Sequence, residues 1–258
     1  MTTTRIAVTA GEPRAHVELA VGALAPRLIS RDGSRAHVAV AAAGMVLLGG
    51  DHVHVAVDVG AGCTLHIQDV GGTVAYPGAS SSWNLDVNIG AGGTLLWDGL
   101  PFVVADGADV ERRSLLTLEP EARAVIRETL VLGRYGEQGG RLISALRADD
   151  DSGPILIEQL EVDGSTPEPG VLGSNRVIDA VTAVGFRPPA RPTDLAFDRP
   201  GAMARHLSDH THGSPLDRVW EAWATYATSR TLSHQRVVAP LPGQAIAAKE
   251  RNIVDIPH

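Results

Sequence analysis

The chain has 258 residues, a formal net charge of −8 and 44% hydrophobic residues, a composition typical of a folded globular protein. The negative charge and the lack of a basic run argue against nucleic-acid binding. A single cysteine, Cys63, excludes an intramolecular disulfide framework and favours a reducing compartment. No segment reaches the roughly 18 consecutive apolar residues of a membrane span, and the first residues lack the apolar region of a signal peptide. We therefore expect a cytoplasmic protein that binds neither nucleic acid nor membrane.

Up to residue 200 the sequence consists of short alternating runs of Val, Ala, Gly, Leu and Thr, which Gly or Asp interrupt. This pattern is typical of many short β-strands. A motif recurs about every 30 residues, at Val57–Leu65, at Val87–Leu95 and, in weaker form, at Leu116–Ala124. Each copy is interpreted as a strand, a tight turn and a returning strand. The repeat predicts a mainly β fold of short antiparallel strands, built as a layered or solenoid-like stack, with one or two helices near the C-terminus.

One predicted strand places a carboxylate in a row of aliphatic residues. With the period of two that strands follow, Glu128 shares its face with Ala124, Ile126, Leu130 and Leu132. The opposite face carries Arg127 and Thr129 and is expected to be the wetter one. An unpaired charge on the apolar face would cost on the order of several kcal/mol. Glu128 therefore requires a partner, a shifted pKa or a function.

Glu158 repeats this anomaly in a second predicted strand, where it shares a face with Leu156, Leu160 and Val162. Two interpretations remain open. Either the acids have an ordinary explanation, which is a partly wet inner face of edge strands or a Glu–Arg pair with Arg134 or Arg141, or they belong to a functional polar line through the interior.

The last third of the sequence predicts a hairpin over residues 141–162, a strand near residues 176–184, and a helix over residues 215–228. Ser214 is the expected N-cap of this helix, Pro215 its first residue, and Asp217 the last member of a capping box. The apolar face of the helix consists of Val219, Trp220, Trp223, Tyr226 and Ala227. We predict a single domain over residues 1–230, followed by a proline-containing tail of unknown order over residues 231–258.

Two clusters of histidines invite a metal-binding interpretation. His52, His54 and Asp58 project to one face of a strand, which resembles the first motif of a cupin enzyme. The second cupin motif would need a later histidine, and Tyr76–Trp83 supplies none; the same three residues also fit an ordinary solvated face.

The second cluster, His206, His210 and His212, precedes the helix. It is suited to holding a borderline divalent ion loosely, or its members are bystanders in a polar loop. The sequence has no nucleophile elbow, phosphate-binding glycine loop, CxxC pair or HExxH helix. We therefore predict that the protein is not an enzyme.

Over roughly residues 20–228 the chain resembles the UreD/UreH family of urease accessory proteins. The segments that carry the resemblance are Gly44–Asp51, Val70–Tyr76, Gly90–Trp97, Glu128–Glu137, Pro154–Leu160 and Arg205–Asp209. The residues that fall on the family's signature motifs are Gly49, Gly50, Asp51, Gly133, Arg134, Gly136 and Glu137. The chain departs from the family at Val74, at Ala42 and Ala43, in the stretch after Trp97, and in its tail past Arg230.

The resemblance implies a non-catalytic scaffold that binds UreF-type and UreG-type partners and docks on apo-urease. In that family nickel is thought to move through an internal polar passage. Asp51, Glu128 and Glu158 lie on matching motifs and would then be weak, exchangeable ligands for nickel in transit, with no tightly bound cofactor. Two alternatives stay open: a cupin-like metal enzyme that uses His52, His54 and Asp58, and a β module that binds a small ligand.

Overall fold

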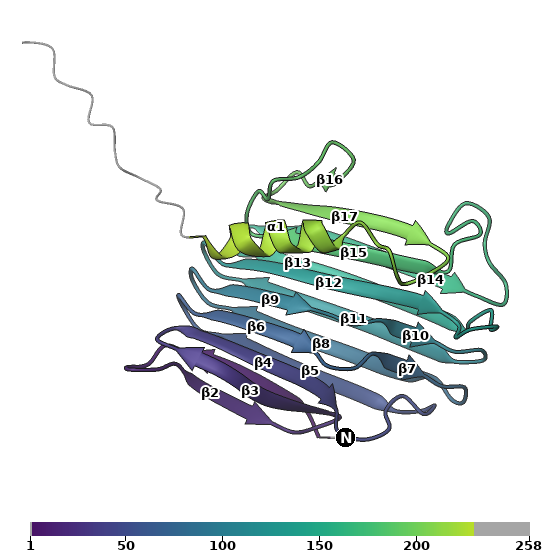
Figure 1. The fold of residues 1–258 in the computed structure, drawn as a ribbon, viewed down its shortest axis with the longest axis horizontal. Coiled ribbons are helices and arrows are strands. Elements are labelled where there is room, and N and C mark those ends of the chain that lie inside the picture. Colours follow the sequence, from purple (N-terminus) through teal and green to yellow (C-terminus); the bar gives the residue numbers. More distant parts are fainter. Residues whose placement is uncertain (1, 230–258) are drawn as a thin grey trace, which may run out of the picture.

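The computed structural model describes residues 2–229, which form two β-sheets and one helix (Figure 1). Sheet A has the strand order β14-β13-β11-β8-β5-β1-β2, and sheet B has the order β16-β17-β15-β12-β9-β6-β4-β3, with β7 and β10 attached beside β12. The strands of sheet A are β1 (Thr4–Thr9), β2 (His16–Ala20), β5 (His52–Val59), β8 (Ser81–Ile89), β11 (Asp109–Leu118), β13 (Arg141–Asp150) and β14 (Gly153–Asp163). Those of sheet B are β3 (Leu24–Asp32), β4 (Arg35–Ala42), β6 (Thr64–Asp69), β7 (Thr73–Ala75), β9 (Thr94–Asp98), β10 (Phe102–Val104), β12 (Arg123–Leu132), β15 (Val177–Val184), β16 (Leu195–Ala196) and β17 (Gly201–Ser208).

The repeat motif marks the coils of this stack. The turn after β5 carries the chain from sheet A to β6 in sheet B, and the chain returns to sheet A with β8, one coil further along. The predicted solenoid-like, mainly β arrangement is therefore confirmed. The hairpin at residues 141–162 and the strand near residues 176–184 are present as the pair β13 and β14 and as β15.

The prediction of antiparallel strands throughout was wrong for the centre of the stack. Strand β8 pairs in parallel with both β5 and β11, and β9 pairs in parallel with both β6 and β12. Antiparallel pairs lie at the ends, for example β1 with β2 and β15 with β17. The reason is that each repeat turn joins the two sheets and does not fold a strand back onto its neighbour. A glycine turn between two strands looks the same in sequence in both cases.

The stacked turns explain the glycines of the repeat. Gly62 and Gly92 take positive φ angles of 65° and 63°, and in the third turn Glu121 takes the same conformation with φ of 63°. The turns are joined by backbone hydrogen bonds, from Gly62 N to Ala91 O and from Gly92 N to Pro120 O, both 2.9 Å long. The weak third copy of the motif therefore has the geometry of the other two, with a side chain where glycine is favoured.

We expect Glu121→Gly to raise the free energy of unfolding by about 0.5–1 kcal/mol, because relief of the left-handed conformation outweighs the greater freedom of glycine in the unfolded chain. Gly92→Ala, the matched change at the preceding turn, is expected to lower stability. Urea unfolding of the two variants checks both signs, and a loss of stability in Glu121→Gly would contradict this account of the turn.

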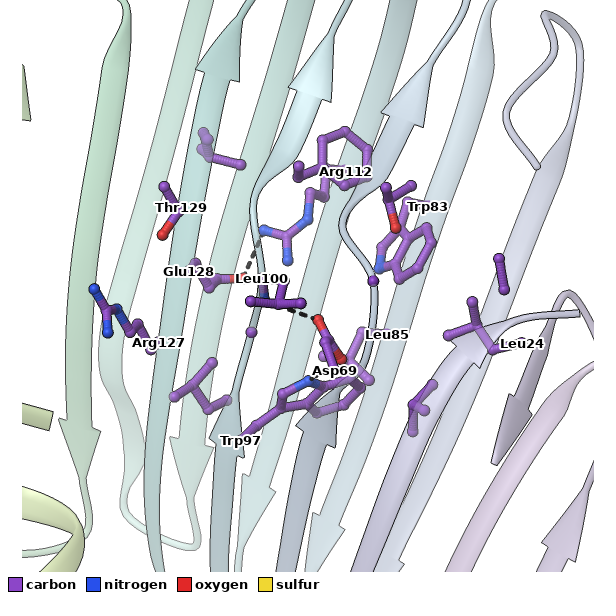
Figure 2. A pocket seen from close by; sticks show the side chains of 18 of the residues that line it. Leu24, Asp69, Trp83, Leu85, Trp97, Leu100, Arg112, Arg127, Glu128 and Thr129 are labelled. Carbon is purple, nitrogen blue, oxygen red and sulfur yellow. Dashed lines mark hydrogen bonds and ion pairs between the residues drawn. The ribbon is translucent and has the colours of Figure 1, made fainter. Parts of the chain in front are cut away.

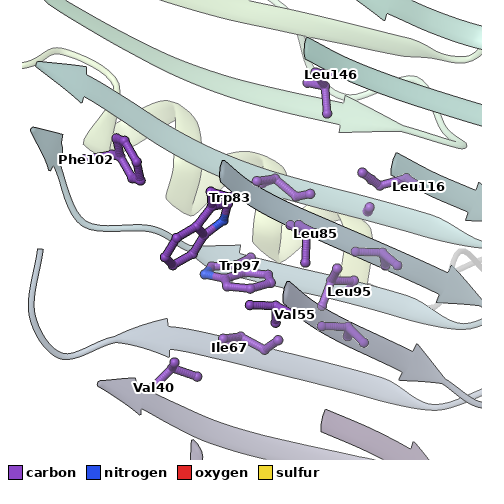
Figure 3. Packing of buried hydrophobic residues seen from close by; sticks show 14 of the residues in the cluster. Val40, Val55, Ile67, Trp83, Leu85, Leu95, Trp97, Phe102, Leu116 and Leu146 are labelled. Carbon is purple, nitrogen blue, oxygen red and sulfur yellow. The ribbon is translucent and has the colours of Figure 1, made fainter. Parts of the chain in front are cut away.

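The core fills the space between the sheets. Its side chains come from the inward positions of successive strands, so that Val55 and Leu85 of sheet A face Ile67 and Leu95 of sheet B (Figure 3). Parallel stacking places the same position of each coil over the previous one and produces continuous apolar rows. The rings of Trp83 and Phe102 meet edge to face, with centroids 5.7 Å apart.

Helix α1 (Asp217–Thr228) covers part of the outer face of sheet B, against β9, β12 and β15 (Figure 1). Val219, Trp223 and Ala227 are buried in this contact, as the predicted apolar face requires. The predicted capping box was wrong, and the helix begins two residues later than expected. Leu216 is the N-cap and has no side-chain cap, the Ser214 hydroxyl accepts a hydrogen bond from Leu216 N, and Asp217 pairs with Arg127.

Among residues 2–229 no helix is long and apolar enough to span a membrane. The predicted tail over residues 231–258 lies outside the described residues.

Candidate functional site

Sheet B is interrupted along one line. Residues 70–72 separate β6 from β7, and residues 99–101 separate β9 from β10. Strand β12 passes both halves without a break: Arg127 is the last partner of β9, and Leu130 is the first partner of β10. Glu128 and Thr129 therefore lie beside the interruption without a ladder partner on that side.

A cavity of about 50 Å³ lies at this interruption and reaches between the two sheets (Figure 2). This volume is sufficient for a few water molecules. Gly71, Gly99, Leu100, Arg127 and Thr129 contribute to its lining where sheet B is interrupted. Its inner wall combines three aromatic side chains, Trp83, Trp97 and Phe102, with three charged ones, Asp69, Arg112 and Glu128.

Glu128 points inward, as the alternation predicted, and it has a partner. Its Oε1 lies 2.5 Å from Nη1 of Arg112, which reaches across from β11 in sheet A. Both side chains are nearly buried, with 16% and 12% of their surface exposed, and the guanidinium lies 5.5 Å from the centroid of the Phe102 ring. The expected Glu–Arg pairing is therefore real, but its partner is neither Arg134 nor Arg141.

Asp69 is a third charged group of the cavity that the sequence analysis missed. Its carboxylate accepts hydrogen bonds from Trp97 Nε1 and from Leu100 N, both 3.1 Å long. Burial raises the pKa of Asp69, while these two hydrogen bonds and the charge of Arg112 act in the opposite direction. The signal for Asp69 was present, because it continues the inward row of Leu65 and Ile67 just as Glu128 continues the row of Ile126.

A second cavity, of about 30 Å³, continues from Glu128 toward the last strands of the stack. Its lining includes Ser144, Thr182 and Glu158, so the two acids singled out in the sequence lie on one cavity. Oε1 of Glu158 lies 2.5 Å from Nη2 of Arg205 in β17, and both side chains are more exposed than the inner pair, at 27% and 30%. The two cavities share Glu128 and Leu130 as lining residues. We refer to the charged and polar side chains of the two cavities together as the polar line.

A second charged network lies on the outer side of the same break. Arg127 donates to Asp179 through Nε and Nη2, at 3.3 and 2.9 Å, and to Asp217 at the start of α1 through Nη1, at 2.7 Å. Thr129 also donates to Asp179. Burial raises the pKa of the neighbouring Asp98, against the charge of Arg127. Through Asp217, helix α1 therefore fixes the position of Arg127, which lines the cavity where sheet B is interrupted.

Asp51, the third predicted acid, lines neither cavity. Its carboxylate accepts a hydrogen bond of 3.1 Å from Leu48 N, in a loop where Gly49 and Gly50 have φ angles of 79° and 80°. A side chain on Gly49 would lie 2.7 Å from the Cα atom of Gly78. In this structure the Gly-Gly-Asp signature shapes the loop before β5.

The signature from Gly133 to Glu137 also shapes a turn. Glu137 accepts hydrogen bonds from Arg134 N at 2.9 Å, from Arg134 Nε at 2.8 Å and from Asp106 N at 3.3 Å. Gly133 and Gly136 supply positive φ angles of 73° and 81°. The motif thus joins the turn after β12 to the turn before β11.

These contacts predict a pH dependence. The hydrogen bonds from Arg134 lower the pKa of Glu137 from 4.5 to about 2. The folded state therefore binds this proton less readily than the unfolded state, so the stabilisation is complete above pH 4.5 and is lost as the pH falls toward 2. We expect Glu137→Gln to flatten the fall in stability across this range, as measured by urea unfolding at stepped pH. An unchanged slope would contradict the assignment.

The predicted histidine clusters are not gathered into metal centres. Within residues 2–229 no three His, Cys, Asp or Glu side chains are arranged to hold a metal ion. His206 lies in β17 opposite Asp179, whereas His210 and His212 stack on each other in an exposed loop. His52, His54 and Asp58 lie on the outer face of sheet A, and each binds its own neighbours. His52 contacts Ser82, and His54 contacts Asp86 and Thr3. Asp58 contacts Arg5 and Asn88. They form the solvated face that was the alternative to a cupin-like site.

The fold and the cavities define a two-sheet β-solenoid protein with charged side chains in two neighbouring cavities of its core. In comparisons with known proteins, residues 15–239 match the family described as UreD urease accessory protein. The chain is 44% identical to urease accessory protein UreD 1 of Streptomyces griseus subsp. griseus over 219 residues, which covers 81% of this chain and 85% of that protein. It is 34% identical to urease accessory protein UreD of Streptomyces avermitilis over 202 residues, or 76% and 77% of the two chains. The chain belongs to the UreD family of urease accessory proteins.

Membership of this family confirms the resemblance drawn from the sequence and supports a role in urease maturation. An accessory role also agrees with the prediction that the chain is not itself an enzyme.

Proposed function

We propose that the protein is a non-catalytic scaffold of urease maturation that works with UreF-type and UreG-type partners and delivers nickel to apo-urease. The observation that carries the proposal is the polar line through the core, in which two cavities share Glu128. Nickel is the cargo in this proposal, and hydrolysis of GTP belongs to the UreG-type partner.

The chemistry of the line suits transfer. Carboxylate oxygens bind a borderline ion such as Ni²⁺ less tightly than thiolates or groups of imidazoles do, so the ion is released easily. Each inward acid is already compensated by an arginine, Glu128 by Arg112 and Glu158 by Arg205. An arriving cation would compete with the guanidinium for the carboxylate, which favours brief occupancy over storage.

The two ends of the line have the features that an entrance and an exit require. At one end the first cavity reaches the interruption of sheet B beside Arg127 and Thr129. At the other end the second cavity includes Glu158 and Arg205, which are more than a quarter exposed. The cavities of about 50 and 30 Å³ have room for a few water molecules. An ion would therefore pass only after it had lost part of its hydration shell.

Complementation and capture test the role as a whole. Cells that hold apo-urease and the other accessory proteins, but no protein of this family, are expected to gain urease activity when this chain is supplied. The purified chain is expected to retain a UreF-type protein and apo-urease in a pull-down assay. If neither protein is retained and urease stays inactive, the proposed role is wrong.

A further inference from the structure

A pair of histidines outside the polar line remains unexplained. His37 in β4 and His66 in β6 are register partners on neighbouring parallel strands. Their rings stack almost parallel, with centroids 4.6 Å apart and an angle of 8° between the planes. Their strand neighbours Val38, Leu65 and Ile67 belong to the core, so the two imidazoles lie on the outer face of sheet B. The His66 ring also contacts Trp220 of helix α1, at 6.5 Å between centroids.

Both rings carry a buried nitrogen without a partner. Nε2 of His37 and Nε2 of His66 are shielded from solvent, and neither forms a hydrogen bond to any described residue. A buried polar atom left unsatisfied is destabilising, so two on stacked rings are a feature that needs an explanation. Burial lowers the pKa of His66 and the neighbouring His37 lowers it further, which keeps this imidazole neutral and its lone pair available at neutral pH.

We infer that His37 and His66 form a binding site for a borderline divalent cation such as Ni²⁺, with water in the remaining coordination positions once the rings have turned and exposed their shielded nitrogens. Imidazole nitrogen is a preferred ligand for this class of ion. Strand pairing places the two rings side by side on one face. Rotation of both side chains would be needed to bring their ring nitrogens to a shared ion. Coordination would also satisfy the unpartnered nitrogens. The site is independent of the acids of the polar line, because it lies on the opposite face of sheet B.

The other histidines of the chain provide controls. His210 and His212 stack at a similar angle of 8°, but in an exposed loop and with centroids 5.4 Å apart. His54 already binds Thr3 and Asp86 through its two ring nitrogens. Among residues 2–229 only His37 and His66 combine strand register, stacking and shielded, unpartnered nitrogens.

The test is calorimetric titration of the full chain with NiCl₂ at neutral pH, accompanied by tryptophan fluorescence. We expect a site of one Ni²⁺ per chain whose filling quenches fluorescence, because Trp220 contacts His66. His37→Phe and His66→Phe keep a stacked ring without a lone pair, and each is expected to weaken binding by at least about tenfold. Trp220→Phe is expected to remove most of the quenching and to retain the calorimetric signal.

The double variant His210→Ala, His212→Ala is the matched control and is expected to bind Ni²⁺ like the parent chain. Thermal unfolding shows whether each Phe variant is folded. If one is not, the double variant His37→Ala, His66→Ala replaces it in the titration. The same titrations are repeated in the Glu128→Gln, Glu158→Gln background, which removes the acids of the polar line as nickel ligands. The inference is wrong if the chain binds no Ni²⁺ in this background or if binding there survives the loss of both histidines. Urease activation in the complemented cells tests the proposed function separately.

Discussion

Replacement of Arg112 by leucine is expected to lower the free energy of unfolding by about 3 kcal/mol, because it leaves a carboxylate buried without its cation. Among residues 2–229 Arg112 is the ion-pair partner of Glu128, and no second one is found. Arg112 also favours the charged form of Asp69, so Asp69 loses the same support. The Phe102 ring loses its contact with the guanidinium as well. Urea unfolding at neutral pH measures the loss.

A double-mutant cycle separates the charge effect from lost packing. Glu128→Leu alone is expected to cost less than Arg112→Leu, because Asp69 still compensates Arg112. The double variant Arg112→Leu, Glu128→Leu is expected to recover most of the loss, since apolar replacement of a whole buried pair is often close to neutral. Arg113, the next residue of β11, is exposed, and Arg113→Leu is expected to change stability by less than about 0.5 kcal/mol. A similar small effect of Arg112→Leu would contradict the importance of the buried pair.

The second large effect is expected on urease activation. The double variant Glu128→Gln, Glu158→Gln keeps the size and the hydrogen-bonding oxygen of each side chain but removes both negative charges from the polar line. We expect at least about a tenfold loss of urease activity per folded chain, as is typical when groups that tune a metal's ligands are removed. The measurement is urease activity in the complemented cells, scaled to the amount of folded accessory protein.

The matched control is Glu111→Gln, Glu161→Gln. These acids lie on strands β11 and β14, on outward-facing positions, and the chemical change is the same. Normal activation is expected. Equal loss in the two double variants would point to a general effect of charge and not to the interior line.

The period of two in the strands was enough to predict which way Glu128 points. It was not enough to find its partner, because Arg112 comes from the other sheet and the pairing depends on how the coils stack. The same missing information led to the prediction of antiparallel strands. Asp69 could have been found by the rule that found Glu128, applied two coils earlier.

The outer face of β12 shows where a local rule fails. Arg127 and Thr129 suggested a wet surface, but Thr129 is buried and Arg127 is only 16% exposed, because Asp179 binds both. The helix that covers this region lies 90 residues from Arg127 in sequence, as the Arg127–Asp217 contact shows. Likewise, the pairing of His37 with His66 follows from strand register, which a single sequence does not give.

The most direct test of the central claim is the nickel content of urease from cells that carry the parent chain, Glu128→Gln with Glu158→Gln, or Glu111→Gln with Glu161→Gln. Urease is purified from each and its nickel is counted by elemental analysis, while a pull-down assay confirms that each variant still retains its partners. We expect urease nearly free of nickel with the interior variant and fully loaded with the other two. Full loading in cells that carry the interior variant would contradict the proposal that nickel travels along the polar line between the sheets.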